Sequence, residues 1–332
     1  MNKGRHIFTV VMAAVGGALL LAGAALFLVG LALEGWDVAA LNNAHFEVRS
    51  YAAAGDIESV HIRYESARIR IESGESFSLT YPVRTNSRGD VLAEVTVTEE
   101  NGVLTVTEAD PFPIWGISFG TGETPALVLT LPAKEYEEIT ASASAGSVAA
   151  EGIAAKALTL RADAGSAEAK GVRVSGAAAF TAALGDVTLR DVEAGSLSAA
   201  ADVGRIEAEQ VRAEREATFT AGLGNIDLRE VEAGSLSAAA DTGSIAADGV
   251  YAESAAFTAN LGDIDLRAVD AASVQLANEL GDIAATLAGT KEEYTIRVQT
   301  ELGSSNVVDR DGGSRRLNAQ TEMGSIRVDF AG

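Results

Sequence analysis

A glycine recurs through the last two thirds of this 332-residue chain at intervals of 19 to 22 residues, and a polar residue usually follows it. The recurring positions are Gly146, Gly165, Gly185, Gly204, Gly224, Gly243, Gly262, Gly281, Gly303 and Gly324. A period of this size is typical of stacked repeats, in which each coil buries its apolar face only against the next coil. The spacing therefore predicts a solenoid, and it points away from catalysis.

Residues before each glycine alternate between apolar and polar side chains. The apolar positions lie five, three and one residue before it, as at Phe180, Ala182 and Leu184. A period of two is the pattern of a strand with one buried face, so all three positions are predicted to face a core. After the glycine the alternation slips by one residue, which predicts a corner between two short strands. A connecting loop would complete each coil.

Large and small residues alternate at the position five residues before the glycine. Phe180, Phe219 and Phe257 occupy every second coil, and Ala199 and Ala238 stand between them. Stacked coils would bring these positions about 4.8 Å apart, where large and small side chains interdigitate. The chain is therefore predicted to be all-β, a parallel β-solenoid with about 19–20 residues per coil.

The N-terminal region carries a second strong signal. Residues Ile7–Leu33 contain no charged side chain over 27 positions, whereas a helix needs only about 20 apolar residues to span a bilayer. Basic residues precede this run and acidic residues follow it, which predicts a single-pass helix with a cytoplasmic N-terminus. A cleaved signal peptide remains the alternative, because Ala22-Gly23-Ala24 offers small residues for cleavage.

Composition narrows the compartment and the partners. The net charge is −22, and such a surface repels nucleic acid, so nucleic acid is not expected as a partner. An exported chain with no cysteine cannot be held by disulfides, which favours a bacterial envelope. The predicted location is the bacterial cell membrane, with the cytoplasmic membrane contacted through residues 7–33 and the body outside the cell.

The predicted organisation follows from these signals. Residues 1–6 form a cytoplasmic tail, 7–33 a transmembrane helix, 34–54 a juxtamembrane linker, 55–140 irregular first β coils and 141–332 the regular solenoid. Within the irregular part, Asn101-Gly102 predicts a hairpin turn. The next segment carries Phe112, Trp115 and Phe119, which are expected either to cap the solenoid or to contact a partner.

Acidic residues flank the glycine corner. They occur two residues before the glycine, as at Glu279, and one residue after it, as at Asp263 and Asp282. Asp263, Glu279 and Asp282 are candidates for weak binding of a divalent cation. The alternative is a solvated edge that resists lateral strand pairing.

Residues with the chemistry of an active site are sparse. The three histidines are scattered, cysteine is absent, and no nucleophile elbow or phosphate-binding loop occurs. Arg190, Arg229 and Arg267 recur in every second coil and are expected to pair with neighbouring carboxylates. The chain is predicted not to be an enzyme and to need no cofactor.

The strand Leu127–Pro132, which ends in Leu-Pro, leads through Tyr136 to Ile139 and then into Gly-Ser-Val repeats. This arrangement resembles the putative-adhesin β-strand-repeat domain family of bacterial envelope proteins, a family of unknown function. The resemblance implies a right-handed parallel β-solenoid and supplies no catalytic residues.

Together, these observations favour a non-catalytic, membrane-anchored cell-surface module that is adhesin-like or serves as an envelope sensor or scaffold. Its partner would be an envelope protein or a cell-wall glycan. The alternative is an exported carbohydrate-active enzyme or a calcium-dependent glycan-binding protein on a β-helix.

Overall fold

The computed structural model describes residues 23, 25–29, 32, 45–85, 89–109 and 124–332. Most of the predicted transmembrane segment 7–33 lies outside these residues, and the few described positions within it are helical. None of the helices found in the described ranges has the length and apolar character needed to cross a membrane.

The described chain is almost entirely β-structure. Its strands are β1 His45–Tyr51, β2 Ser59–Tyr64, β3 Ile69–Gly74, β4 Ser78–Thr85, β5 Val95–Glu100, β6 Val103–Glu108, β7 Leu127–Pro132, β8 Glu135–Ala145, β9 Val148–Glu151, β10 Ala154–Ala164, β11 Ala167–Leu184, β12 Val187–Val203, β13 Ile206–Leu223, β14 Ile226–Thr242, β15 Ile245–Leu261, β16 Ile264–Leu280, β17 Ile283–Ala288, β18 Tyr294–Leu302, β19 Arg315–Met323 and β20 Ile326–Ala331. A short 3-10 helix, Lys291–Glu293, precedes β18.

The chain divides into two compact units. The larger comprises Val48–Pro82, Val95–Ala109 and Thr124–Gly332. In the smaller, the described residues around Val83–Glu94 fold back on themselves, and the Leu92 N–H donates to the Arg84 carbonyl at 2.8 Å.

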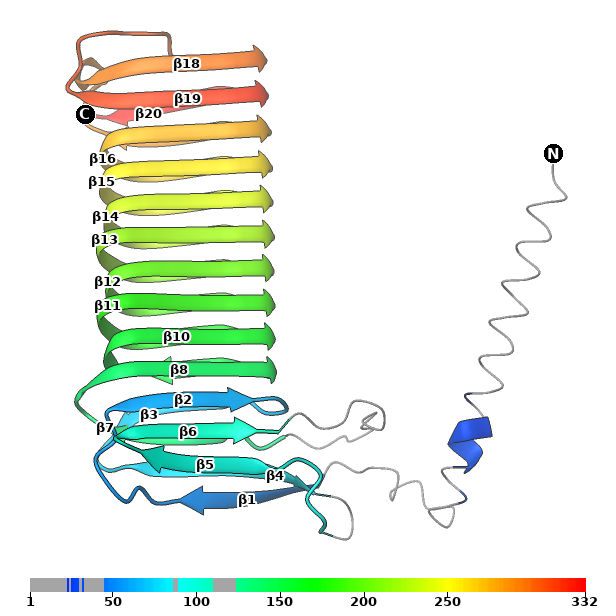
Figure 1. Ribbon diagram of the computed structural model, residues 1–332. Coiled ribbons are helices and arrows are strands. Elements are labelled where there is room, and N and C mark those ends of the chain that lie inside the picture. The colour runs from blue at the N-terminus through cyan, green and yellow to red at the C-terminus, as the bar shows by residue number, and fades with distance from the viewer. Residues whose placement is uncertain (1–22, 24, 30–31, 33–44, 86–88, 110–123) are drawn as a thin grey trace, which may run out of the picture. The chain divides into compact units, whose positions relative to one another are not determined.

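The larger unit is a parallel β-solenoid, as the glycine spacing predicts. From β10 to β16 each strand pairs in parallel with the next strand along the chain, and Figure 1 shows them as a stack of parallel arrows. The core alternation is also confirmed. Phe180, Ala199, Phe219, Ala238 and Phe257 lie in register on successive coils, and each is at most 1% exposed.

The predicted connecting loop is wrong. Strands β11 to β16 run for 17 or 18 residues, so almost the whole coil is strand. A second bend lies six residues after the glycine, where Asp191 and Glu230 both have φ of +53°. Register shifts lie between Val174 and Ala177 in β11 and between Ala213 and Glu216 in β13. Each shift inserts one extra residue into its strand. This insertion explains why some coils have 20 residues and others 19.

The buried-face assignment is wrong at one of its three positions. From β10 to β16, residues five and three before the glycine are buried, whereas Leu184 and its equivalents directly before the glycine are exposed. The backbone turns outward as it enters the corner, so two consecutive residues there face solvent. The sequence pattern does not reveal this, because alternation alone assumes a straight strand.

The two ends of the solenoid depart from sequence order. At the N-terminal end, β2 lies between β6 and β8, and β3 lies between β7 and β9. At the C-terminal end, β19 lies between β16 and β18, as the orange and red arrows of Figure 1 show. The predicted turn at Asn101-Gly102 joins β5 and β6 as an antiparallel pair.

Strand β18, which ends the stack, is covered along its open edge. Ile296 and Arg310 exchange backbone hydrogen bonds of 2.8 and 3.0 Å, and the Val298 N–H donates to the Asp309 carboxylate at 2.9 Å. The segment between β18 and β19 therefore blocks the edge on which a further strand could add.

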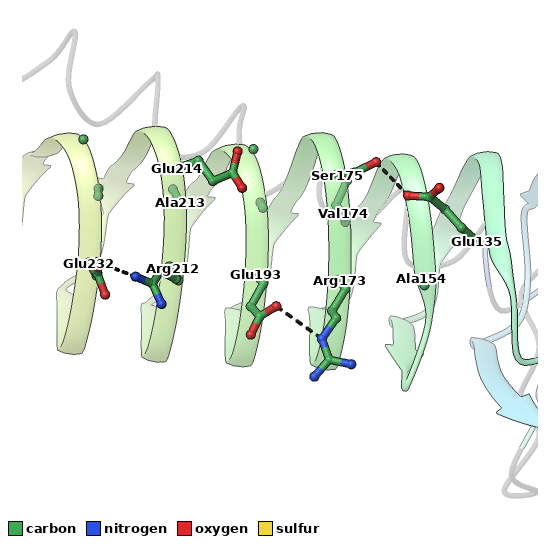
Figure 2. Close-up of a pocket in the computed structure, with 14 residues that line it drawn as sticks. Glu135, Ala154, Arg173, Val174, Ser175, Glu193, Arg212, Ala213, Glu214 and Glu232 are labelled. Carbon is green, nitrogen blue, oxygen red and sulfur yellow. Dashed lines mark hydrogen bonds and ion pairs between the residues drawn. The ribbon is translucent and has the colours of Figure 1, made fainter.

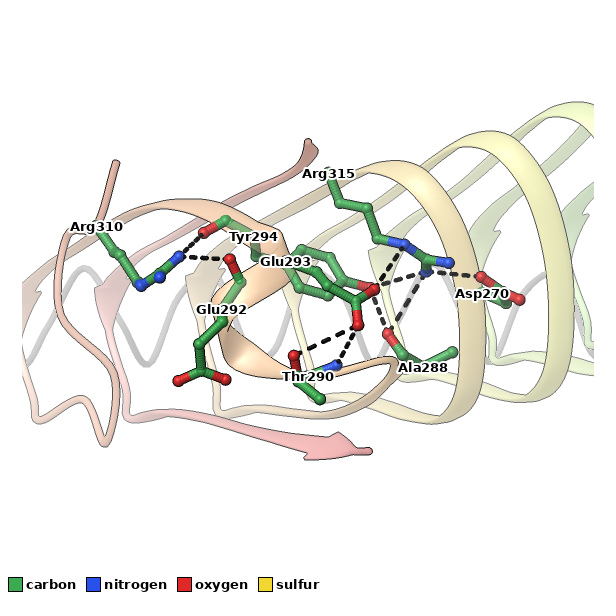
Figure 3. A network of polar contacts seen from close by, with 8 residues as sticks. All are labelled: Asp270, Ala288, Thr290, Glu292, Glu293, Tyr294, Arg310 and Arg315. Atoms are coloured by element: carbon green, nitrogen blue, oxygen red, sulfur yellow. Dashed lines mark hydrogen bonds and ion pairs between the residues drawn. The ribbon is translucent and has the colours of Figure 1, made fainter. Parts of the chain in front are cut away.

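A polar network fastens this end (Figure 3). The Arg315 guanidinium donates to the Asp270 carboxylate at 2.7 Å and to the Tyr294 hydroxyl at 3.3 Å. The Tyr294 hydroxyl in turn donates to the Ala288 carbonyl at 2.8 Å. Burial raises the pKa of Tyr294, although Arg315 opposes the rise. The network therefore joins β16, β19 and β18, the three strands at the place where β19 is inserted out of sequence order.

Candidate functional site at the glycine corner

The recurring glycines form one continuous column. From Gly146 to Gly281 and at Gly324 their φ angles lie between +143° and +157°, a range that side chains avoid. A Cβ atom at Gly204 would meet the Gly185 carbonyl oxygen at 1.9 Å, and one at Gly224 would meet the Gly204 carbonyl oxygen at the same distance. The corner therefore needs glycine both for its conformation and for the close approach of successive coils.

The polar residue after each glycine holds the next coil. The Asp186 carboxylate accepts a hydrogen bond from the Arg205 N–H at 2.7 Å, and the Asn225 side chain accepts one from the Ser244 N–H at 2.9 Å. Ser147, Ser166 and Ser244 accept equivalent bonds. A short side chain with an acceptor oxygen is what this contact requires, which explains the recurrence of Ser, Asp and Asn.

Two of the three candidates for cation binding, Asp263 and Asp282, make this same contact with the next coil. Asp263 accepts from the Asp282 N–H at 2.8 Å, and Asp282 accepts from the Ser325 N–H at 2.7 Å. Glu279 lies on the opposite side of the corner, two residues before Gly281. Among the residues described, no three His, Cys, Asp or Glu side chains are placed to share a metal ion. Cation binding therefore remains a prediction.

The residues directly before the glycines form an exposed apolar row, named here the apolar ladder. Its members are Leu184, Val203, Leu223, Thr242, Leu261, Leu280, Met323 and Leu302, in spatial order. The apolar members are between 43% and 66% exposed. Sequence reasoning found these positions but assigned them to the core.

An acidic row runs beside the apolar ladder, two residues before the glycine, and is interrupted at Ala183, Gly222 and Asn260. Its carboxylates belong to Asp163, Asp202, Asp241, Glu279, Glu322 and Glu301. Asp163 pairs with Arg161 at 2.7 Å. The other five make no ion pair with any described basic residue, although a hydrogen bond of 3.2 Å joins Asp241 to Asn260.

Elsewhere on the coils, basic side chains are paired with carboxylates. A groove of about 830 Å³ lies there, and along it Arg173, Glu193, Arg212 and Glu232 alternate on successive coils (Figure 2). Arg173 pairs with Glu193 at 3.2 Å, and Arg212 pairs with Glu232 at 2.7 Å. The groove has two arginines and four glutamates in its lining, so it stays acidic, but each arginine is paired with a glutamate.

The remaining candidate residues are the three recurring arginines and the three aromatic residues of segment 110–123. The three recurring arginines lie near carboxylates, as the sequence predicts: Arg190 is 3.8 Å from Glu209, and Arg267 is 3.3 Å from Asp265. Arg229 is 3.8 Å from Glu207. Phe112, Trp115 and Phe119 lie outside the described residues, so their role remains a prediction.

The family described as Toastrack DUF4097 matches residues 57–222 and again residues 191–331, which together cover most of the chain. The chain belongs to this family. The Toastrack family has no established function, and the resemblance noted in the sequence is confirmed.

Solved structures also resemble this Toastrack chain. A putative adhesin from Parabacteroides merdae is 14% identical, with a TM-score of 0.36 over 88% of this chain and 98% of the other. A putative adhesin from Bacteroides fragilis is 13% identical, with a TM-score of 0.36 over 86% and 97%. At this level of similarity neither structure identifies a site or a partner. No curated protein matches the chain.

Proposed function

We propose that this chain is a non-catalytic, membrane-anchored module of the bacterial envelope, adhesin-like or serving as a sensor or scaffold, whose solenoid presents a surface to a partner. The observation that carries the proposal is the repetition of the surface. Polar and charged groups recur from coil to coil, as in the groove of Figure 2, where Arg173–Glu193 and Arg212–Glu232 repeat one arrangement. A catalytic centre needs a unique set of groups held around one reacting atom. A repeated surface suits an extended partner.

The membrane anchor is supported by the uncharged run Ile7–Leu33 and by the basic residues before it. Anchoring would hold the Toastrack unit at the outer face of the cytoplasmic membrane, where its net negative charge keeps it soluble.

Cysteine labelling tests the location. Because the natural chain contains no cysteine, one introduced thiol reports on one position without interference. In intact cells, a membrane-impermeant maleimide should label Ser273→Cys, at a partly exposed position on strand β16, and should leave Asn2→Cys unlabelled. Labelling of Ser273→Cys only after lysis would contradict an extracellular body.

Incubation of the purified full chain with cell-wall glycan tests the absence of catalysis. We expect no release of soluble fragments, with or without added calcium. Calcium-dependent release of fragments would overturn the proposal in favour of a carbohydrate-active β-helix. Retention of intact glycan by the protein would instead identify a glycan as the partner.

A further inference from the structure

The apolar ladder is an extended surface that stays exposed among the residues the structure describes. Seven of its eight positions are apolar, with Thr242 as the exception, and the strand registers place them on successive coils. Coils are spaced by about 4.8 Å, so the ladder runs for about 34 Å. A continuous exposed apolar surface of this kind marks an interaction site more often than scattered single residues do.

Charge on both sides of the ladder is acidic. Asp202, Asp241, Glu279, Glu322 and Glu301 line one side without basic partners among the described residues, and Asp186, Asp263 and Asp282 line the other. The basic residue that follows a corner glycine in the described coils, Arg205, is 3.4 Å from Asp227. Beside Leu280 and Met323, a groove of about 330 Å³ is lined by Glu279, Glu301 and Glu322.

These features together select a cationic partner with an apolar face. Anionic lipid head groups would meet the acidic rows and be repelled. A second copy of this chain would bring acidic rows against acidic rows, at a net charge of −22 for each copy. A segment with an apolar stripe between basic residues meets a carboxylate beside most ladder positions, although Leu223 lies between Gly222 and Asn225.

The backbone at the corner constrains the partner's conformation. From Gly146 to Gly281 and at Gly324, the corner glycine donates its N–H to a carbonyl of the neighbouring coil, as from Gly224 to Thr242 at 2.9 Å and from Gly243 to Leu261 at 2.8 Å. The corner therefore has no free backbone edge to which an extended strand could add. A helix satisfies its own backbone and can present side chains alone.

We infer that the apolar ladder and its two acidic rows bind a basic amphipathic α-helix of a partner protein. At 1.5 Å per residue, about 22 residues would span the ladder. Apolar side chains every three to four residues would contact the ladder, and flanking lysines or arginines would contact the carboxylates. This inference deepens the proposed function by naming the chemistry of the partner.

Fluorescence anisotropy with the purified full chain tests the inference. The probe is a labelled 22-residue Leu/Lys peptide with its leucines on one helical face, and a scrambled peptide of the same composition is the control. We expect saturable binding of the patterned peptide, at least about 10-fold tighter than that of the scrambled one, and weaker binding as salt rises.

Two sets of variants locate the site. Leu223→Ser with Leu261→Ser and Leu280→Ser should weaken binding at least about 10-fold. Asp202→Asn with Asp241→Asn and Glu279→Gln should reduce its salt dependence without removing the apolar contact. Tyr251→Ser with Val308→Ser changes two exposed apolar residues elsewhere and should leave binding unchanged. Because the charge variants keep the leucines, they remain informative if the serine variants fold poorly.

Three outcomes would overturn the inference. Equal binding of patterned and scrambled peptides is one, and binding that survives both sets of ladder variants is another. The third is loss, in the serine variants, of concentration-dependent self-association or of binding to anionic vesicles, which would assign the ladder to a second copy or to a lipid surface. All of these measurements use purified protein, so their failure would leave the cysteine-labelling result intact, and the converse also holds.

Discussion

The glycine corner and the bend six residues later both turn the chain with positive φ, yet they use different residues. Every regular corner from Gly146 to Gly281 is glycine, with φ between +143° and +157°. The bend, with φ between +50° and +73°, accepts Gly171, Asp191, Gln210, Glu230, Gly249 and Ala268. A Cβ added at Gly249 would have no neighbour closer than 3.6 Å, whereas one at Gly224 would meet a carbonyl oxygen at 1.9 Å.

The difference shows what makes glycine obligatory in this fold. The left-handed conformation at the bend costs an ordinary residue only about 1–2 kcal/mol, which the surrounding coils can offset. At the corner, successive backbones approach so closely that no side chain fits. The periodic glycine therefore reports the contact between coils, and only secondarily the turn.

The largest effect that separates the two sites is expected from alanine at each. Gly224→Ala should lower the free energy of unfolding by about 4 kcal/mol, because it combines backbone strain with a collision against the Gly204 carbonyl. Gly249→Ala should cost only about 1 kcal/mol. Urea unfolding followed by circular dichroism measures both, and equal losses would refute the distinction.

A smaller difference is expected from the polar side chains at the corner and at the bend. Asp263→Ala removes the acceptor for the Asp282 N–H and should cost about 1 kcal/mol. At the bend, the Glu230 carboxylate accepts only a side-chain hydrogen bond from Gln210, at 3.1 Å, so Glu230→Ala should change stability by less than about 0.5 kcal/mol. Thermal unfolding of the two variants in parallel makes the comparison, and a larger loss at Glu230 would reverse it.

The apolar ladder gives a further test of how the chain enters the corner. Leu261→Ala should change the free energy of unfolding by less than about 0.5 kcal/mol, since Leu261 is 48% exposed. Leu266→Ala, at a position that is 1% exposed, should cost about 2–5 kcal/mol. Similar losses in urea unfolding would mean that the ladder is covered in the folded protein.

The smallest effect is expected from placing glycine at the bend. Glu230→Gly relieves a left-handed conformation but adds flexibility to the unfolded chain, and these terms of about 1 kcal/mol nearly cancel. Stability should therefore change by less than about 0.5 kcal/mol in thermal unfolding. A loss as large as that of Gly224→Ala would show that the bend has steric limits of its own.

Several features of the fold could be predicted from the sequence because they repeat. The glycine interval predicts stacked coils, and the alternation of Phe180, Phe219 and Phe257 with alanines predicts a core that interdigitates along the axis. Both are confirmed, since identical positions in stacked coils meet one another. The Ser/Asp/Asn residue after the glycine was visible in the sequence too, but its contact with the next backbone was not.

The features that broke the pattern could not be predicted. Alternation placed Leu184 and Leu261 in the core, because it cannot register that the chain turns outward one residue before the corner. In space, β19 lies between β16 and β18, and β2 lies between β6 and β8, so neither follows the order of the chain. These positions depend on pairing between strands that are far apart in the sequence.

The amino-acid sequence by itself determined the coil length, the glycine corner and the alternating core, because each of these depends on contacts between equivalent positions. Only the tertiary structure decided which apolar residues remain in solvent, which acidic groups lack a basic partner and how the two ends are closed. Those outcomes depend on the direction of the backbone at the corner and on contacts between residues far apart in the chain, neither of which a local pattern encodes.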